Sequence, residues 1–299
     1  MSDEPARKWR ILDAPSNLGL SPLRPGSVPG CARLPAVLRA NGLVARLGAD
    51  DRGTVVPPPY RAEHREEWGA LNLPAIAEYT PRLADRIDTE LSPSTRLLVL
   101  GGDCSILLGC MLALRRRGRF GLLFLDAHSD FRHPGNSPRV GWVAGEDLAL
   151  VTGRGDPRWT DLESRRPYVR DDDVRLLGIR RNDECLEELR SLSIPFATSD
   201  DLRGHDPASA AARLAQSLDP ACDGFWVHFD ADVVDPSEIS AVDSPEGPGL
   251  SIAELSQVLR ELVANPRFVG LDVTIFDPDL DLDGTQSRRL TDGLVGALW

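Results

Sequence analysis

Apolar runs of strand length recur along the chain, and most are apolar at consecutive positions rather than at every second one. Continuous runs of this kind are typical of strands buried on both faces of a parallel sheet. Six runs predict strands: RLLVLGG at 96–102, GLLFLDA at 121–127, VRLLGIR at 174–180, IPFATS at 194–199, FWVHFDAD at 225–232 and FVGLDVTIF at 268–276.

Helical patterns separate several of these runs. They are SILLGCMLALRRRG at 105–118, DPASAAARLAQSL at 206–218 and SIAELSQVLRELVAN at 251–265. The first ends with basic residues in its last turn and with Gly118 as a stop, which is typical of a helix C-terminus. Strands alternating with helices predict a doubly wound α/β sheet. No internal repeat or linker interrupts the pattern, so we expect a single domain over 1–299.

Composition narrows the class of protein and its partners. With 299 residues, 41% hydrophobic and 27% charged, the chain is typical of a globular protein that needs no disulfides. The net charge of −12 argues against nucleic acid or an anionic membrane as a partner, so we expect a small-molecule substrate. No apolar stretch approaches the roughly 20 residues that span a bilayer, and the start, MSDEPARKWRIL, lacks the apolar segment of a secretory signal. Scattered cysteines without a CxxC pair indicate reduced thiols and a cytoplasmic protein; they are Cys31, Cys104, Cys110, Cys185 and Cys222.

The first candidate chemistry follows the run LLFL, where DAHSD sets Asp126, His128 and Asp130 at alternate positions. Side chains at i, i+2 and i+4 of a strand lie on one face, so this spacing gathers two carboxylates and an imidazole. Such groups repel one another or lose solvation unless a positive charge lies among them. The segment therefore predicts a metal site.

Further polar clusters also follow predicted strands. They are GGDCS at 101–105, HFDADVVDP at 228–236 and DVTIFDP at 272–278. Because ligands bind beyond the carboxyl ends of strands in open parallel sheets, clusters far apart in sequence can meet at one edge. With DAHSD they supply a histidine, the nearby Cys104 and four aspartates, which are Asp126, Asp130, Asp230 and Asp232. Two divalent ions bridged by carboxylates match this count better than one ion, and Mn²⁺ suits oxygen ligands with one imidazole.

Two other interpretations compete with a metal site. A single D-x-D at a strand end is common as a turn or a helix N-cap. Alternatively, Asp230 is a phosphoryl-accepting nucleophile, but this leaves DAHSD unexplained. The order GGD, DAHSD and DAD, each after an apolar strand, favours the metal site.

The motifs resemble those of the ureohydrolase family, which includes arginase, agmatinase and formiminoglutamase. GGDCS resembles the family's G-G-D-H-S, DAHSD matches D-A-H-x-D, and FDADVVDP matches D-x-D-x-x-D-P. DVTIFDP resembles a later D-x-x-E-x-N-P element, and residues 19–43 resemble a Gly/Pro-rich loop that leads to a Leu-Arg helix. The resemblance covers most of the chain. It implies a three-layer α/β/α sandwich with a mostly parallel sheet, and a homo-oligomer, either a trimer or a hexamer.

The resemblance also implies roles for individual residues. The ligands of one Mn²⁺ would be Cys104, Asp126, Asp130 and Asp230; those of the other would be Asp126, His128, Asp230 and Asp232. A hydroxide between the ions would attack the planar carbon of a guanidine or amidine, because metals lower the pKa of bound water. Asp130 would carry the proton toward the leaving amine. The residues that would support the ligands from behind are Asp103, His228 and Asp235.

Cys104 departs from the family pattern, which usually has His at this position. As a thiolate it would still bind a metal, but a soft donor favours Zn²⁺, Fe²⁺ or Co²⁺ over Mn²⁺. Alternatively, Cys104 is a buried thiol beside a site with five other ligands. The identity of the first metal depends on which of these holds.

The substrate pocket departs further. The family's S-G-N-x-H-G corresponds to VGWVAG, so Val140, Trp142 and Ala144 stand where hydroxyl, amide and imidazole groups are expected. Ile275 stands where a late Glu would meet a guanidinium group. These replacements argue against arginine as the substrate, and Trp142 suggests a more apolar or aromatic ligand, unless it only packs.

Two further residues are candidates for the substrate site. Asp183, in GIRRND, corresponds to a family position near the amine of the substrate. His133 would replace the missing proton relay, although a solvated loop histidine is the simpler interpretation.

We therefore expect a binuclear metal hydrolase that acts on a linear amidine, guanidine or related C–N bond other than that of arginine. Two alternatives stay open at this point. One is a non-catalytic, metal-binding member of the family that binds a ligand or a partner subunit. The other is a deacetylase-like amide hydrolase with the same fold and metals.

Overall fold

A computed structural model of the chain describes residues 7–63, 69–203 and 206–299. Their strands form one eight-stranded sheet in the order β2-β1-β3-β8-β7-β4-β5-β6, and every neighbouring pair is parallel. The strands are β1 (Lys8–Asp13), β2 (Asp50–Thr54), β3 (Thr95–Leu100), β4 (Phe120–Leu125), β5 (Val174–Ile179), β6 (Phe196–Thr198), β7 (Gly224–Asp230) and β8 (Phe268–Thr274).

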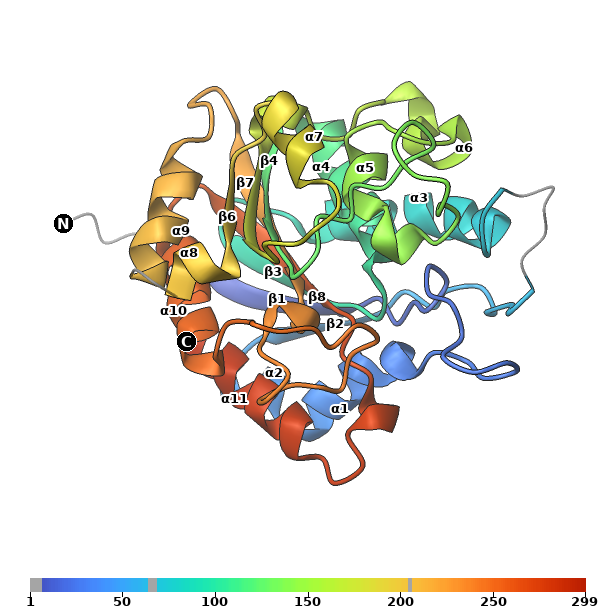
Figure 1. Cartoon of the computed structure of the whole chain (residues 1–299). Helices are drawn as coiled ribbons and strands as arrows, with labels where there is room; N and C mark the ends of the chain where they lie inside the picture. Colours follow the sequence, from blue (N-terminus) through green and yellow to red (C-terminus); the bar gives the residue numbers. More distant parts are fainter. Residues whose placement is uncertain (1–6, 64–68, 204–205) are drawn as a thin grey trace.

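Helices cover both faces of this sheet (Figure 1). One layer contains α1 (Leu34–Ala40), α2 (Leu43–Arg46), α8 (Ser199–Arg203), α9 (Pro207–Gln216), α10 (Ile252–Ala264) and α11 (Thr285–Leu298). The other contains α3 (Leu73–Glu90), α4 (Leu107–Arg117), α5 (Asp147–Val151), α6 (Pro157–Thr160) and α7 (Leu186–Ser191). The predicted three-layer α/β/α sandwich is confirmed.

The two cores follow from the alternation of side chains along each strand. In β7, Phe225, Val227 and Phe229 enter the core under α9 to α11, whereas Trp226 enters the core under α3 to α7. Every residue of β7 is buried, which explains why its sequence reads as a continuous apolar run.

The six predicted strands all form, and the three predicted helices appear as α4, α9 and α10. A capping box between Ser251 and Glu254 begins α10, and Gly118 ends α4 as expected. The sequence did not reveal β1, β2, α3 or α11. Charged residues interrupt the apolar pattern of β1 and dominate the edge strand β2, while Pro81 lies inside α3. Within the described ranges, none of the helices has the length and apolar character needed to cross a membrane.

The loop after β3 positions Cys104, and its packing allows a direct test. A Cβ added at Gly102 would lie 1.7 Å from the backbone carbonyl oxygen of Ser16, which accepts a hydrogen bond from the N–H of Asp103. We expect Gly102→Ala to lower the free energy of unfolding by at least about 1–3 kcal/mol, the usual cost of overpacking. Chemical denaturation measures it.

Gly296→Ala is the matched control, because a Cβ there meets nothing within 4 Å and the residue lies in α11. Removing a helical glycine stabilises by roughly 0.5–1 kcal/mol. Equal stabilities of the two variants would contradict the close approach at Gly102.

Candidate metal centre

The central strands β3, β8, β7 and β4 are neighbours in the sheet, so the loops at their carboxyl ends meet. This adjacency brings together the polar clusters that the sequence analysis placed after separate strands. Three groups of side chains there have ligand atoms within 4.8 Å of one another. They are Asp126, His128 and Asp232; Cys104, His228 and Asp230; and Cys104, Asp130 and Asp147.

The first group joins the DAHSD and DAD motifs. His128 Nδ1 lies 2.9 Å from Asp232 Oδ2, and Asp232 Oδ1 accepts a hydrogen bond from the backbone N–H of Ala127 at 3.1 Å. Asp126 Oδ1 accepts from the backbone N–H of His128, whereas its buried Oδ2 has no hydrogen-bond partner among the described residues. The arrangement leaves one buried oxygen of this group, Asp126 Oδ2, without a donor among the described residues.

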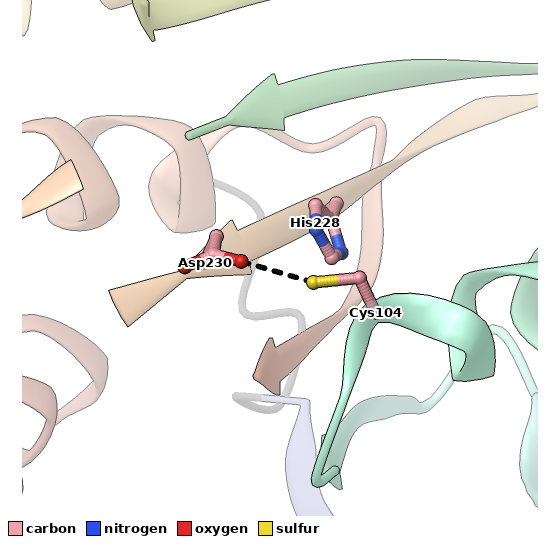
Figure 2. Close-up of side chains that lie close together, drawn as sticks. All are labelled: Cys104, His228 and Asp230. Atoms are coloured by element: carbon pink, nitrogen blue, oxygen red, sulfur yellow. Dashed lines mark hydrogen bonds between the residues drawn. The ribbon is translucent and has the colours of Figure 1, made fainter. Parts of the chain in front are cut away.

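The second group lies deeper in the sheet. Cys104 begins a 3₁₀ turn, and its thiol donates to Asp230 Oδ2 at 2.9 Å and contacts Thr274 Oγ1 at 3.2 Å. Figure 2 shows Cys104 reaching from its loop toward Asp230 and the ring of His228. Asp230 Oδ1 accepts from the backbone N–H of Asp232, so this aspartate joins the two groups.

Asp147 is the ligand candidate that sequence reasoning missed. It is the first residue of α5 and is fully buried, and neither of its carboxylate oxygens has a hydrogen-bond partner in the part of the chain that the structure describes. An acidic residue in the first turn of a helix is common without any ligand, so its sequence context gave no signal. Asp147 reaches the cluster only because α5 packs against the sheet, which the sequence did not predict.

Burial and mutual repulsion dominate the electrostatics of the centre. Burial, and then the neighbouring carboxylates, raise the pKa values of Asp126 and Asp147 well above the usual range. Burial does the same for Asp230, and it raises the pKa of Asp130 to about 6. Burial opposes the charge on His128, yet Asp232 and its neighbours raise the pKa of this imidazole to about 10. These groups need added positive charge, which bound cations or protons can supply.

A cavity of about 570 Å³ opens above the cluster. Asp130 and His128 line it, as do the three predicted substrate residues Trp142, Asp183 and Ile275. Asp183 is held by the backbone and hydroxyl of Ser129, Trp142 is 38% exposed, and Ile275 adopts a φ of 72°. The structure therefore brings the predicted substrate residues to the same cavity as the predicted ligands.

His133 does not join this site. Its Nε2 lies 3.0 Å from Glu188, its Nδ1 accepts from the backbone N–H of Gly135, and it is absent from the residues that line the cavity. Glu188 of α7 and the backbone of the His133 loop thus occupy both ring nitrogens. The structure therefore gives no support for a proton-relay role of His133.

The three predicted supporting residues have different surroundings. Asp103 caps the turn of Cys104 and accepts from the backbone N–H of Gly19, so it does hold the loop of a candidate ligand. Asp235 accepts from Gly249 and Ser237 and shapes the following loop instead. His228 does not stand behind the ligands as expected: it lies in one group with Cys104 and Asp230.

A parallel α/β/α sandwich with buried carboxylates, imidazoles and a thiol under an open cavity defines an α/β protein with a candidate metal centre. The Arginase family model matches residues 14–298, and the chain therefore belongs to the arginase family. This confirms the resemblance to ureohydrolases. Proteins of this family hydrolyse amidino C–N bonds with a binuclear metal centre.

Individual relatives agree with this assignment. Arginase from Bacillus caldovelox is 28% identical over 300 residues, and the match covers 97% of each chain. Its structure has a TM-score of 0.86 at 25% identity and covers 98% of each chain. Formimidoylglutamase from Bacillus subtilis subsp. subtilis str. 168 shares the fold, with a TM-score of 0.73, 20% identity, and coverage of 99% of this chain and 88% of the other.

Proposed function

We propose that this chain hydrolyses an amidino C–N bond with the help of two divalent cations. The observation that carries the proposal is a set of buried acceptor atoms that find no donor in the described part of the chain, under a cavity that can admit a small molecule. Asp126 Oδ2 and both Asp147 oxygens belong to this set. The donor set fits divalent cations, because carboxylates and imidazoles are their usual ligands. When bound, such cations lower the pKa of a coordinated water and supply a nucleophile near neutral pH.

Different residues of the chain would bind the cations and transfer the proton. His128, Asp126 and Asp232 would hold the cation nearer the cavity, and Asp230 would be shared between the two positions. Asp130 is half-buried, lines the cavity and has a φ of 44°, a conformation that a non-glycine residue keeps only when its surroundings enforce it. Its carboxylate is therefore placed to accept a proton and to pass it to the leaving amine.

The charge of the cavity wall supports a cationic substrate. Seven acidic residues and three arginines line it, and because the cations would compensate Asp230 and Asp232, five acidic residues stand against three arginines. The acidic residues are Asp130, Asp183, Glu184, Asp230, Asp232, Asp243 and Glu246. Arg132 and Arg139 also lie against Glu184, which offsets part of their charge. A guanidinium or amidinium group would be attracted to such a wall.

We further propose that the preferred substrate is an amidino compound other than arginine. The names of the relatives do not support this exclusion, and its ground is the lining alone: Trp142 and Ala144 present no amide or imidazole to an α-amino acid. A single domain over 1–299, a cytoplasmic location and a homo-oligomeric assembly, trimer or hexamer, stay predictions.

The test is release of urea or ammonia by the protein loaded with Mn²⁺, Zn²⁺ or Co²⁺, using arginine, other guanidino compounds and formimino compounds. We expect metal-dependent turnover of at least one compound and weak turnover of arginine. Trp142→Asn, which supplies the amide of the family motif, should raise kcat/KM for arginine about 10-fold or more relative to the preferred compound. Trp299→Asn is the control, since Trp299 is 87% exposed and does not line the cavity.

Arginine as the best wild-type substrate would overturn the specificity proposal. Full metal loading without turnover of any compound would favour the non-catalytic alternative. Turnover of acetylated amines alone would favour the deacetylase-like one.

A further inference from the structure

His228 is held in a fixed orientation by its neighbours in the sheet. Strand register pairs His228 of β7 with Asp272 of β8, and the ring Nδ1 lies 2.6 Å from Asp272 Oδ2. The ring also stacks on Phe124, with centroids 4.7 Å apart. A carboxylate acceptor at Nδ1 places the proton there, so Nε2 carries a free lone pair. This carboxylate–imidazole pair is the arrangement that orients histidine ligands in metal sites.

The lone pair of His228 faces other acceptors. Nε2 is buried and makes no hydrogen bond within the described ranges, and the nearest Asp147 oxygen lies 3.8 Å away. Cys104 Sγ and an Asp230 oxygen lie within 4.8 Å of a His228 nitrogen and of each other. The thiol proton of Cys104 is directed at Asp230. Asp147 faces the Asp130 carboxyl, with which it can share a proton, whereas His228 Nε2 has no partner among the described residues.

The distance between His228 Nε2 and Asp147 Oδ2 shows whether the two groups are hydrogen-bonded to each other or are placed to bind one cation. A hydrogen bond between a protonated His228 and Asp147 would need about 2.7–3.2 Å, which is shorter than the 3.8 Å observed. Two ligands of one tetrahedral cation with bonds of 2.0–2.3 Å lie about 3.3–3.8 Å apart. The spacing of His228 and Asp147 therefore matches donors that share an ion better than donors that bond to each other. Cys104 and Asp230 lie closer, at 2.9 Å, because the thiol donates its proton to the carboxylate, and a cation that replaces this proton would separate them.

We propose that the deeper of the two cations, away from His128, is bound by His228 Nε2, Cys104 Sγ, an Asp147 carboxylate oxygen and Asp230. The imidazole of this site would then come from β7, while the family motif places it at position 104, where this chain has Cys. A thiolate with one imidazole selects Zn²⁺, Co²⁺ or Fe²⁺ over Mn²⁺. The inference rests on the proposed metal centre but not on turnover.

The test titrates the metal-free, full-length protein with Co²⁺. The number of bound ions comes from elemental analysis, the coordination from visible and near-ultraviolet absorption. We expect two Co²⁺ per chain, with a thiolate-to-cobalt charge-transfer band. His228→Gln and Asp147→Asn should each weaken binding of one ion by more than about 100-fold, since even a partner behind a ligand is worth 10–100-fold. The ion at Asp126, His128 and Asp232 should remain.

Matched variants separate ligation from folding. His133→Gln removes a histidine outside the cluster and should keep both ions, and Cys104→Ser should lose the charge-transfer band. Asp272→Asn alters the group behind His228, keeps an oxygen that can accept from Trp226 Nε1, and should weaken one ion by about 10–100-fold. Adding Cys104→His to His228→Gln returns an imidazole to the family position and should restore the second equivalent. This rescue keeps the test valid even if His228→Gln folds poorly.

Two Co²⁺ bound with wild-type affinity and spectra by both His228→Gln and Asp147→Asn would overturn the inference. So would wild-type protein without the thiolate band, or wild-type protein in which Zn²⁺ fails to displace Mn²⁺ from either position. Two ions bound as predicted but no turnover would support the inference and count against the proposed function. The two failures are therefore distinguishable.

Discussion

Asp230→Asn is expected to lower the rate of metal-dependent hydrolysis by far more than about 100-fold. Removing a residue that only hydrogen-bonds a metal ligand already lowers metal affinity or activity by about 10–100-fold. Asp230 lies in the deeper group with Cys104 and His228, and its other oxygen accepts from the backbone N–H of Asp232. It is thus the residue through which both cation positions are connected. Removing its charge should weaken both ions together.

The variant should nevertheless fold. The amide oxygen can still accept from the backbone N–H of Asp232, while the Cys104 thiol can donate to Thr274 Oγ1 instead. A neutral amide also needs neither a proton nor a cation to compensate a buried charge. We expect the metal-free melting temperature of Asp230→Asn to equal or exceed that of the wild type, measured together with Mn²⁺ and Zn²⁺ affinity. Asp172→Asn, at an exposed position, is the control. Wild-type affinity for both ions in Asp230→Asn would contradict the shared-ligand role.

Removal of metal is expected to have the second large effect, on stability. The cations bind the folded cluster but find no such cluster in the unfolded chain, so binding stabilises the fold by mass action. One ion at 100 times its Kd adds about 2.7 kcal/mol, which corresponds to a melting temperature about 5–10 °C higher for a large domain. Two ions should raise it further.

Calorimetry of the chelated protein with and without added Mn²⁺, Zn²⁺ or Co²⁺ measures this difference. Mg²⁺ is a useful control, because it prefers several waters and oxygen ligands alone. An unchanged melting temperature with all three transition metals would mean that the buried acceptors are satisfied by protons. It would also remove the main support for the proposed function.

The buried position of the cluster explains why both effects should be large. Asp126, Asp147 and Asp230 are at most 2% exposed, so water cannot offset their repulsion. Burial raises their pKa values, which means that protons must stand in for cations in the metal-free protein. A cation thus replaces protons in a place where charge compensation is needed in any case.

Many residues of the candidate metal centre could be predicted from the sequence, because they follow one another at alternate positions within short segments. Asp126, His128 and Asp130 lie on one strand end, and Asp230 and Asp232 repeat the pattern, so strand geometry alone gathers each set. The parallel sheet then places both sets at one edge. His133, by contrast, lies only three residues from Asp130, yet its loop turns the ring toward Glu188. Proximity in sequence gave no information about the direction of that side chain.

The sequence by itself therefore determined the parallel sheet, its central strands and the motif residues that meet at its edge, because apolar runs and alternate spacing act over a few residues. Only the tertiary structure decided the place of Asp147 and the orientation of His228. Asp147 reaches the cluster because α5 packs against the sheet, and His228 is oriented by Asp272, 44 residues away on the neighbouring strand. Such contacts depend on strand register and helix packing, which no short stretch of sequence specifies.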